Sequence, residues 1–349
     1  MRIGMVGAGA VAARHVRTLL AMDGVEVAAV ADPALERAKE LAAEAGAAAY
    51  PNHMELLEAE RLDAVYICVP PFAHGAPELA VIDAGLPMFV EKPVAIDQET
   101  AAAIAARLTG RSLVTCTGYH WRWLDIFDRA AALLADRPAR LVQCWWLDKV
   151  PPPPWWLRRD GSGGQTIEQT THVLDAARGL AGDVAEVHAF GAGAAAADDI
   201  HDVSVASLRF ASGAVGTVAS TCLLPRLHRA GVQVVADGLS LELSETELVV
   251  EVDGRRDGWT ADGDARPRPD RDFVAAVRGG ENRIRVPWPE AYRTHLLACA
   301  ITRSADQGRP VPVPEGSGRR GPGNPGGVPR SVGELSQGGA PVDRGRTDG

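Results

Sequence analysis

The chain has 349 residues, which is enough for two domains of ordinary size, each with a core of its own. A hydrophobic fraction of 46% and a charged fraction of 23% are typical of a soluble globular protein. The formal net charge of -9 disfavours binding to nucleic acid or to an anionic membrane. The sequence starts directly with a strand-like run, and no apolar stretch reaches the ~20 residues that span a bilayer. We therefore expect a cytoplasmic protein without a membrane segment.

The cysteines and acidic residues offer no convincing metal site. The five cysteines are widely spaced, four in predicted strands and one in a predicted helix: Cys68, Cys116, Cys144, Cys222 and Cys299. This arrangement suits reduced core thiols rather than disulfides. Asp198, Asp199, His201 and Asp202 cluster before a predicted strand, but their spacing is not that of a ligand set, so we interpret them as a solvated loop. We predict no metal ion.

The N-terminus has the pattern of a dinucleotide-binding unit. A strand over Ile3–Val6 is followed at once by a G-x-G-x-x-A turn and by a helix over Val11–Met22. Gly7 permits the tight turn, Gly9 lets the backbone approach a pyrophosphate, and Ala12 lets helix and strand pack closely. The helix N-terminus offers unpaired N–H groups and a positive dipole end to the phosphates. The predicted cofactor contacts in this turn are Gly7, Gly9, Ala10 and Val11.

An acidic residue follows the second strand. Val25–Ala31 ends in Asp32-Pro33, and a carboxylate at this place can accept hydrogen bonds from the adenosine ribose hydroxyls. It would also repel the 2′-phosphate of NADP, so we expect NAD in preference to NADP. Asp32 can equally cap the helix predicted from Ala34, and the two roles can coexist.

Strands alternate with helices through the first third of the chain. Strands are predicted at Leu62–Val69, Met88–Val90 and Ser112–Thr117, and helices at Ala34–Ala45, Gly75–Ala84 and Gln98–Leu108. This alternation indicates right-handed βαβ units and a parallel, doubly wound sheet. Pro70 and Pro71 form a rigid lip after one strand, and His74 either begins the next helix or faces the nicotinamide. Another strand stops at Glu91-Lys92-Pro93, which brings a lysine to the carboxyl edge of the sheet, where open α/β sheets bind ligands.

The glycine turn, Pro70-Pro71-x-x-His74 and Glu91-Lys92-Pro93 together resemble, in order and spacing, the Gfo/Idh/MocA family of nicotinamide-dependent oxidoreductases. The resemblance covers roughly Arg2 to Val313. It implies an α/β Rossmann domain over 1–120, then an α+β domain with an open, mainly antiparallel sheet over 121–313, whose late helices pack back on the first. It also implies a site in the cleft between the domains, with these further residues at the cofactor: Pro70, His74, Glu91 and Lys92.

A helix in the second half carries the proton-handling residues that the resemblance implies. It is predicted to run from Gln165 to Ala181, with Glu168 and His172 four residues apart on one face and Asp175 three further along. A carboxylate and an imidazole on one face suit proton transfer, because the pKa of histidine lies nearest neutrality. The family has an acid-x-x-x-His-x-x-Asp helix at this place, and many members carry aspartate where this chain has Glu168.

Aromatic side chains gather near the predicted cleft. The loop 118–123 closes the last strand of the first domain, and in the family a comparable loop lies near the nicotinamide, which makes Tyr119 a candidate substrate contact. Four tryptophans flank a run of four prolines: Trp145, Trp146, Trp155 and Trp156. Indole faces stack on the C–H faces of sugar rings and also fill cores. We expect one or two of the four to line the site, with Trp155 as a candidate.

The remainder predicts antiparallel strands, two helices and a tail. The strands are Glu186–Gly191, Asp202–Phe210, Ala214–Cys222, Val232–Ala236, Ser240–Leu243 and Glu247–Val252, and the helices are Asp270–Arg278 and Glu290–Ser304. Short alternating strands with hairpin turns indicate one open sheet. The stretch 314–349 is rich in Gly, Pro, Arg and Ser, so it cannot bury a core, and we expect it to be disordered.

The resemblance implies reversible hydride transfer between C4 of nicotinamide and a secondary carbinol of a sugar, cyclitol or amino sugar. Lys92 and His172 would handle the reacting hydroxyl, and either can be the proton acceptor. The predicted substrate contacts are Lys92, Tyr119, Trp155, Glu168, His172 and Asp175. Two alternatives stay open: an NAD-assisted glycoside hydrolase that works by transient oxidation and elimination, and a cofactor-binding sensor without chemistry. Since relatives often assemble through the open sheet, we also expect a homodimer or homotetramer.

Overall fold

A computed structural model describes residues 1–193 and 199–316 of the chain. The first part contains sheet A, six parallel strands in the order β3-β2-β1-β4-β5-β6. Its strands are β1 (Arg2–Val6), β2 (Glu26–Ala31), β3 (Ala48–Tyr50), β4 (Ala64–Ile67), β5 (Met88–Val90) and β6 (Thr115–Thr117). The predicted tail lies outside the described residues from 317 onward, and so does Asp198 of the acidic cluster.

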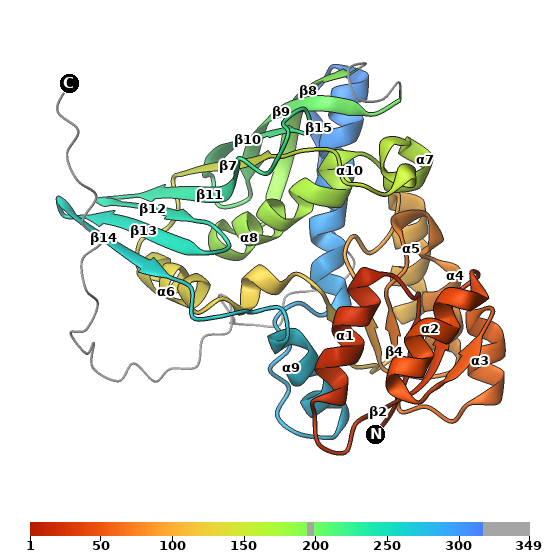
Figure 1. Cartoon of the computed structure of the whole chain (residues 1–349). Coiled ribbons are helices and arrows are strands. Elements are labelled where there is room, and N and C mark those ends of the chain that lie inside the picture. Colours follow the sequence, from red (N-terminus) through yellow and green to blue (C-terminus); the bar gives the residue numbers. More distant parts are fainter. Residues whose placement is uncertain (194–198, 317–349) are drawn as a thin grey trace.

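Five helices wind around sheet A (Figure 1). They are α1 (Ala10–Leu20), α2 (Leu35–Ala45), α3 (His53–Ala59), α4 (Ala76–Asp83) and α5 (Gln98–Leu108). Strands β4 and β5 are buried along their whole length, as expected for a central parallel strand covered on both faces. Sequence reasoning missed β3 and α3, because the edge strand Ala-Ala-Tyr is short and has little β-branched or aromatic character.

The second part contains sheet B, nine strands in the order β14-β13-β12-β11-β7-β10-β9-β8-β15. Its strands are β7 (Leu141–Leu147), β8 (Val184–Gly193), β9 (His201–Phe210), β10 (Val215–Thr221), β11 (Arg229–Ala236), β12 (Leu239–Leu243), β13 (Glu247–Val252), β14 (Arg255–Thr260) and β15 (Val311–Pro312). All neighbours are antiparallel except β7 and β10. Side chains of β9 alternate strictly between buried and not buried, so one face of the sheet packs on a core.

The helices of the second part lie either against sheet B or beside sheet A (Figure 1). They are α6 (Asp125–Leu134), α7 (Arg159–Ser162), α8 (Thr171–Ala181), α9 (Arg268–Val277) and α10 (Trp288–Gln307). Helix α10 contacts β8 and α8 on one side, and α5 and β6 on the other. Helix α9 contacts β6 and α1. The predicted fold class, a Rossmann unit followed by an α+β unit with an open antiparallel sheet, is confirmed.

The predicted helix Gln165–Ala181 is not one α-helix. A π-helical turn over Thr166–Thr170 precedes α8. This stretch is crowded with β-branched side chains, which are stiff at χ1 and lower helix propensity. Single π-helical turns occur often at functional sites, and this one carries Glu168.

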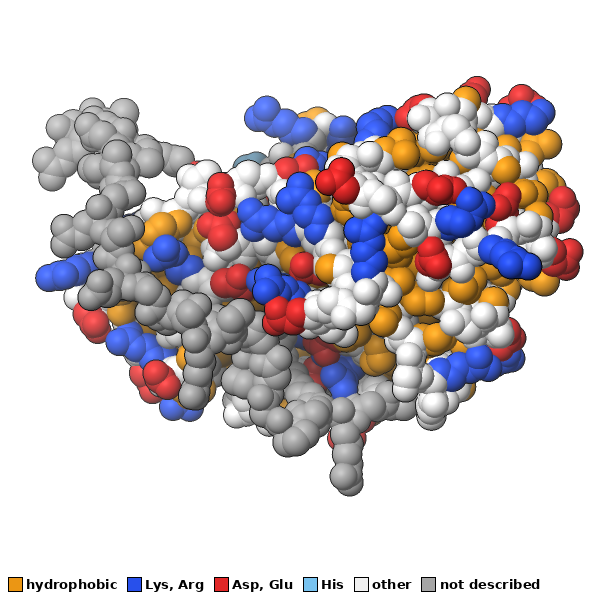
Figure 2. Space-filling view, turned by 90° about the horizontal axis from the view of Figure 1, so that it is seen from below, with side chains coloured by type: hydrophobic (Ala, Val, Ile, Leu, Met, Phe, Trp, Pro, Cys, Tyr) orange, Lys and Arg blue, Asp and Glu red, His pale blue; other side chains and the backbone are white. Residues whose placement is uncertain are grey.

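The cysteines are core thiols, as the sequence predicted, and the displayed surface carries charges of both signs. All five cysteines are buried and free, as predicted. Figure 2 shows that Lys and Arg side chains are interspersed with Asp and Glu side chains on the face it displays. Among residues 1–193 and 199–316, no helix combines the length and apolar character needed to cross a membrane.

Candidate active site

The glycine turn between β1 and α1 has the geometry of an anion cradle. Gly7 has φ +98°, and a Cβ at this position would lie 2.4 Å from the carbonyl oxygen of Cys68, so no other residue fits. A Cβ on Gly9, in contrast, would meet nothing within 4 Å. Gly9, Ala10 and Val11 are exposed, and no side chain caps the N-terminus of α1. The turn therefore fits a pyrophosphate group held by backbone N–H groups and the helix dipole.

Asp32, directly after β2, connects this turn to the next helix. Its Oδ2 accepts a hydrogen bond from the N–H of Ala8 at 2.9 Å, and its Oδ1 accepts one from the N–H of Ala34 at 2.8 Å. Helix α2 begins at Leu35 with Ala34 as its N-cap and without a side-chain cap, so the predicted N-cap role of Asp32 is wrong, and its bond to Ala34 forms an Asx turn before the helix. The carboxylate also lies at the edge of the glycine turn, where the ribose of a bound dinucleotide would be.

Glu91, at the end of β5, is anchored by a buried charge network that sequence reasoning missed. Its Oε1 lies 2.9 Å from Nε2 of His15 and 3.3 Å from Nη2 of Arg14. Nδ1 of His15 lies 2.7 Å from Oδ1 of Asp270 on α9. A Cβ on Gly118 would lie 2.4 Å from the Glu91 carboxylate, so a glycine is required beside it. The only sequence signal for His15 is its place on the buried face of α1.

The network keeps both partners charged. Burial alone would lower the pKa of His15, but the charges and hydrogen bonds of Asp270 and Glu91 outweigh it and raise that pKa to about 9. Burial would raise the pKa of Glu91, yet the hydrogen bond and charge of His15 lower it overall. The residue next to Lys92 is therefore a carboxylate held by a buried imidazolium.

This network predicts a pH-dependent contribution to stability. Because the pKa of His15 is raised to about 9, its contribution is complete below pH ~6.5 and is lost as the pH rises through about 9. We expect the free energy of unfolding of the wild-type protein to exceed that of His15→Asn by up to ~3 kcal/mol near pH 6. This difference should shrink by pH 10, as urea denaturation at several pH values would show. A difference that stays constant across this range would contradict the charged network.

Lys92 and Glu168 join sheet A to the helix of the second half. Nζ of Lys92 donates to the backbone carbonyl of Glu168 at 2.9 Å and to its Oε1 at 2.8 Å. Oε2 of Glu168 accepts a hydrogen bond from Nε1 of Trp156 at 2.8 Å, and the Trp156 side chain is fully buried. Since an ammonium group has three N–H donors, Lys92 keeps one donor free beside this pair.

His172, at the start of α8, lies in an aromatic pocket. Its ring stacks on Trp146 with the centroids 5.5 Å apart, and the rings of Tyr119 and His120 meet it edge-on at 6.1 and 5.5 Å. Its Nδ1 is buried without a partner among the described residues. Burial lowers the pKa of His172 well below the ordinary histidine value, and the positive charges of Lys92 and His120 lower it further. His172 is therefore neutral at pH 7 and can accept a proton at Nε2.

Asp175 does not join this group, although its spacing predicted that it would. Its Oδ2 accepts a hydrogen bond from Nε of Arg122 at 2.7 Å, and its Oδ1 accepts one from Oγ1 of Thr294 at 2.9 Å. The Asp175 side chain is 1% exposed and that of Arg122 is 8% exposed. Asp175 thus connects α8 to α10 and to the loop after β6.

The other candidates, Tyr119, Trp155 and His74, each contact a further residue. The hydroxyl of Tyr119 is 2.7 Å from Oγ1 of Thr171, and burial raises the pKa of Tyr119 well above its ordinary value. The ring of Trp155 meets that of Phe72, next to the Pro70 lip, at 6.4 Å. Nδ1 of His74 bonds to Oε1 of Glu78 at 2.5 Å, while its Nε2 is buried without a partner in the described part of the chain.

Two protein-family models match the chain. The model described as an oxidoreductase family with an NAD-binding Rossmann fold matches residues 1–119. The model described as the GFO/IDH/MocA C-terminal domain matches residues 138–242. The first model thus covers sheet A, and the second covers strands β7 to β11 and most of β12 in sheet B.

Curated relatives and solved structures agree with these matches. Myo-inositol 2-dehydrogenase of Thermotoga maritima is 29% identical over 229 residues, which make up 62% of this chain and 67% of the relative. D-xylose 1-dehydrogenase (NADP(+)) 2 of Haloferax volcanii is 27% identical over 329 residues, or 89% of this chain and 99% of the relative. The WlbA dehydrogenase of Bordetella pertussis, solved with NADH and UDP-GlcNAcA, has a TM-score of 0.79 at 22% identity and covers 90% of this chain and 99% of its own. At this identity the structural likeness shows a shared fold.

Proposed function

The chain belongs to the GFO/IDH/MocA family of NAD-binding oxidoreductases, and from this premise we propose that it oxidises a secondary carbinol of a sugar, cyclitol or amino sugar, or reduces the corresponding ketone. One observation carries the proposal. Lys92, at the carboxyl edge of sheet A, is hydrogen-bonded to Glu168, four residues before the neutral His172. We therefore infer that a donor and a proton acceptor lie together at the carboxyl edge of sheet A, the edge that carries the dinucleotide turn. Relatives named as inositol and xylose dehydrogenases support the substrate class.

The cofactor residues present in the chain fit NAD. The exposed backbone of Gly9, Ala10 and Val11 would hold the pyrophosphate, and Asp32 would accept hydrogen bonds from the ribose hydroxyls. When NAD is bound, it supplies a hydride acceptor or donor at C4 of its nicotinamide. Because the Asp32 carboxylate would repel a 2′-phosphate, NAD is preferred to NADP. Pro70 and His74 would border the nicotinamide side of the same edge.

Lys92 acts as hydrogen-bond donor and charge stabiliser at the reacting oxygen. Two of its three N–H donors bind Glu168, and the third is directed by that pair. The Glu168 carboxylate forms an ion pair with the ammonium group at 2.8 Å and so fixes its position as a hydrogen-bond donor. As the carbinol is oxidised, negative charge develops on its oxygen, and the ammonium stabilises this charge most in the transition state.

His172 acts as the proton acceptor in oxidation and as the proton donor in reduction. Burial and nearby positive charges lower the pKa of His172, so the imidazole carries no charge at pH values near 7. The rings of Trp146, Tyr119 and His120 surround the imidazole and hold its plane. This division of labour makes Lys92 the donor and His172 the base.

The experiment that tests the reaction follows NADH absorbance when the purified protein is mixed with NAD and a panel of inositols, sugars and amino sugars. We expect reduction of NAD by at least one cyclic polyol, with kcat/KM retained down to below pH 6.5 because the pKa of His172 is lowered. NAD binding without any net reduction across the panel, in either direction, would contradict the proposal.

We also propose that the enzyme is a cytoplasmic homo-oligomer that assembles through the outer face of sheet B. Phe190, Val205, Ala219 and Trp145 lie side by side on four neighbouring strands of this face. Phe190 is 66% exposed and Val205 48%, so the row supports burial against a second copy. The buried free cysteines suit a reducing compartment. Light scattering should show a dimer or tetramer that Val205→Asp weakens, and a monomeric wild-type protein would contradict the proposal.

A further inference from the structure

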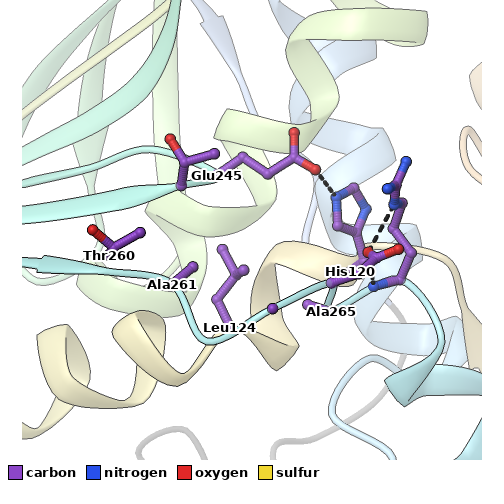
Figure 3. A pocket seen from close by; sticks show the side chains of 10 residues that line it. His120, Leu124, Glu245, Thr260, Ala261 and Ala265 are labelled. Carbon is purple, nitrogen blue, oxygen red and sulfur yellow. Dashed lines mark hydrogen bonds and ion pairs between the residues drawn. The ribbon is translucent and has the colours of Figure 1, made fainter.

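A cavity of about 200 Å³ lies beside the proposed active site and has no role in the reaction described above (Figure 3). His120 lines the cavity, and the edge of the same ring meets His172 at 5.5 Å between centroids. His172 itself does not line it. One imidazole ring therefore separates the cavity from the proposed proton acceptor.

Hydrogen bonds fix the three segments that form the walls of the cavity. The walls come from residues 120–124, from the turn between β12 and β13, and from the loop 260–266 that leads to α9. The N–H of Asp262 donates to Oδ1 of Asp125 at 2.9 Å, and Nη1 of Arg268 donates to the carbonyl of Trp123 at 2.8 Å. Oγ of Ser244 accepts the N–H of Glu247 at 2.9 Å and so closes the turn. The cavity is pre-formed on three anchored segments.

The lining is rich in hydrogen-bond acceptors. Figure 3 shows the Glu245 carboxylate reaching toward the His120 ring, and its Oε1 lies 2.8 Å from Nε2 of His120. Nε of Arg266 donates a hydrogen bond to Oδ1 of Asp264 at 2.8 Å. The hydrogen bond to His120 lowers the pKa of Glu245, which therefore stays ionised. The cavity thus carries both acceptors, on Glu245 and Asp264, and donors, on Arg266, and suits a group that carries several hydroxyls.

We propose that this cavity is a second sugar subsite, which takes a hydroxyl-bearing ring linked to the ring that is oxidised, with Glu245 as its specificity-determining acceptor. This inference rests on the proposed function, because the reacting ring must lie at Lys92 and His172. The cavity volume of about 200 Å³ has room for one ring.

The test is calorimetric titration of the NADH-bound protein with matched one-ring and two-ring sugars: myo-inositol and galactinol, glucose and maltose, glucose and cellobiose. We expect the two-ring member of at least one pair to bind about tenfold more tightly than the one-ring member. Glu245→Ala should abolish this advantage and leave one-ring binding unchanged. Glu247→Ala, the same change at an exposed position that does not line the cavity, should preserve it.

Equal affinity for the two members of every pair, an advantage that survives Glu245→Ala, or no binding by any sugar would each overturn the inference. NAD reduction by the same sugars is recorded in parallel samples that contain NAD in place of NADH, to separate the two proposals. Hydride transfer without a Glu245-dependent preference contradicts only the subsite. Glu245-dependent binding of two-ring sugars without NAD reduction contradicts only the proposed reaction.

Discussion

Lys92→Ala is expected to lower kcat for the true substrate about 10²- to 10³-fold, because the variant lacks the donor that stabilises charge on the reacting oxygen. NAD affinity should change little, since the glycine turn and Asp32 hold the dinucleotide independently of the Lys92 side chain. The measurement is steady-state turnover together with a fluorescence titration of NADH. Loss of turnover with intact NADH binding assigns Lys92 to the chemical step.

The matched control for this variant is Lys39→Ala. Lys39 lies on α2, is 54% exposed and pairs only with Glu36 on its own helix. The same chemical change there should leave kcat, KM and NADH binding at wild-type values. Near-normal turnover by Lys92→Ala would remove the lysine from the mechanism. A joint loss of NADH binding and turnover would place Lys92 in cofactor binding instead.

Asp175→Ala is expected to cost about 3 kcal/mol of unfolding free energy, because it leaves the buried guanidinium of Arg122 without its main partner. Among residues 1–193 and 199–316, Glu290, whose Oε1 is 3.3 Å from Nη2 of Arg122, would remain as the ion-pair partner. Urea denaturation at pH 7 measures the loss. At a temperature where the variant is folded, KM for the substrate should match the wild-type value.

A surface pair provides the comparison for Asp175. Asp160 pairs with Arg158, and both side chains are about two thirds exposed, at 67% and 68%. Asp160→Ala should leave the unfolding transition unchanged, since exposed ion pairs contribute little. If Asp175→Ala were as stable as the wild-type protein and yet raised KM strongly, Asp175 would be a substrate contact rather than a stabilising residue.

The parts of the fold that local periodicity determines could be predicted from the sequence. Helix α5 (Gln98–Leu108) has the predicted bounds, because Asp97 caps it and a clear apolar stripe follows. The short edge strand β3 and helix α3 were missed, since neither has a strong pattern. The π-helical turn at Glu168 was also missed, because sequence spacing does not distinguish it from an α-helical turn.

The candidate site was predictable where a motif marked it and not where tertiary contacts decide. The Glu-Lys-Pro motif pointed to Lys92, and helical spacing pointed to Glu168 and His172. In the structure Lys92 bonds to Glu168, and its charge lowers the pKa of His172. Trp155 and Trp156 are neighbours in a proline-rich loop without periodicity, so the sequence could not show that Trp156 is the one that bonds to Glu168.

Local sequence patterns do not show which residues far away in the chain are hydrogen-bond partners. His15 bonds to residues 76 and 255 positions away in the chain. Asp175 shares a predicted helix stripe with His172, but an arginine 53 positions earlier holds its carboxylate. A histidine or aspartate on an otherwise apolar helix face indicates that such a partner exists. It does not indicate which residue the partner is.

The most direct test of the account is deuterium transfer from the best substrate of the panel, prepared with deuterium on its ring carbons, to NAD. We predict that mass spectrometry will find one deuterium in each NADH formed, and that NADH will accumulate in step with the ketone product. Cleavage of a glycoside with no net NADH would instead indicate the hydrolytic alternative. NAD binding without deuterium transfer from any panel member would indicate a sensor, and either result would contradict the proposed dehydrogenase.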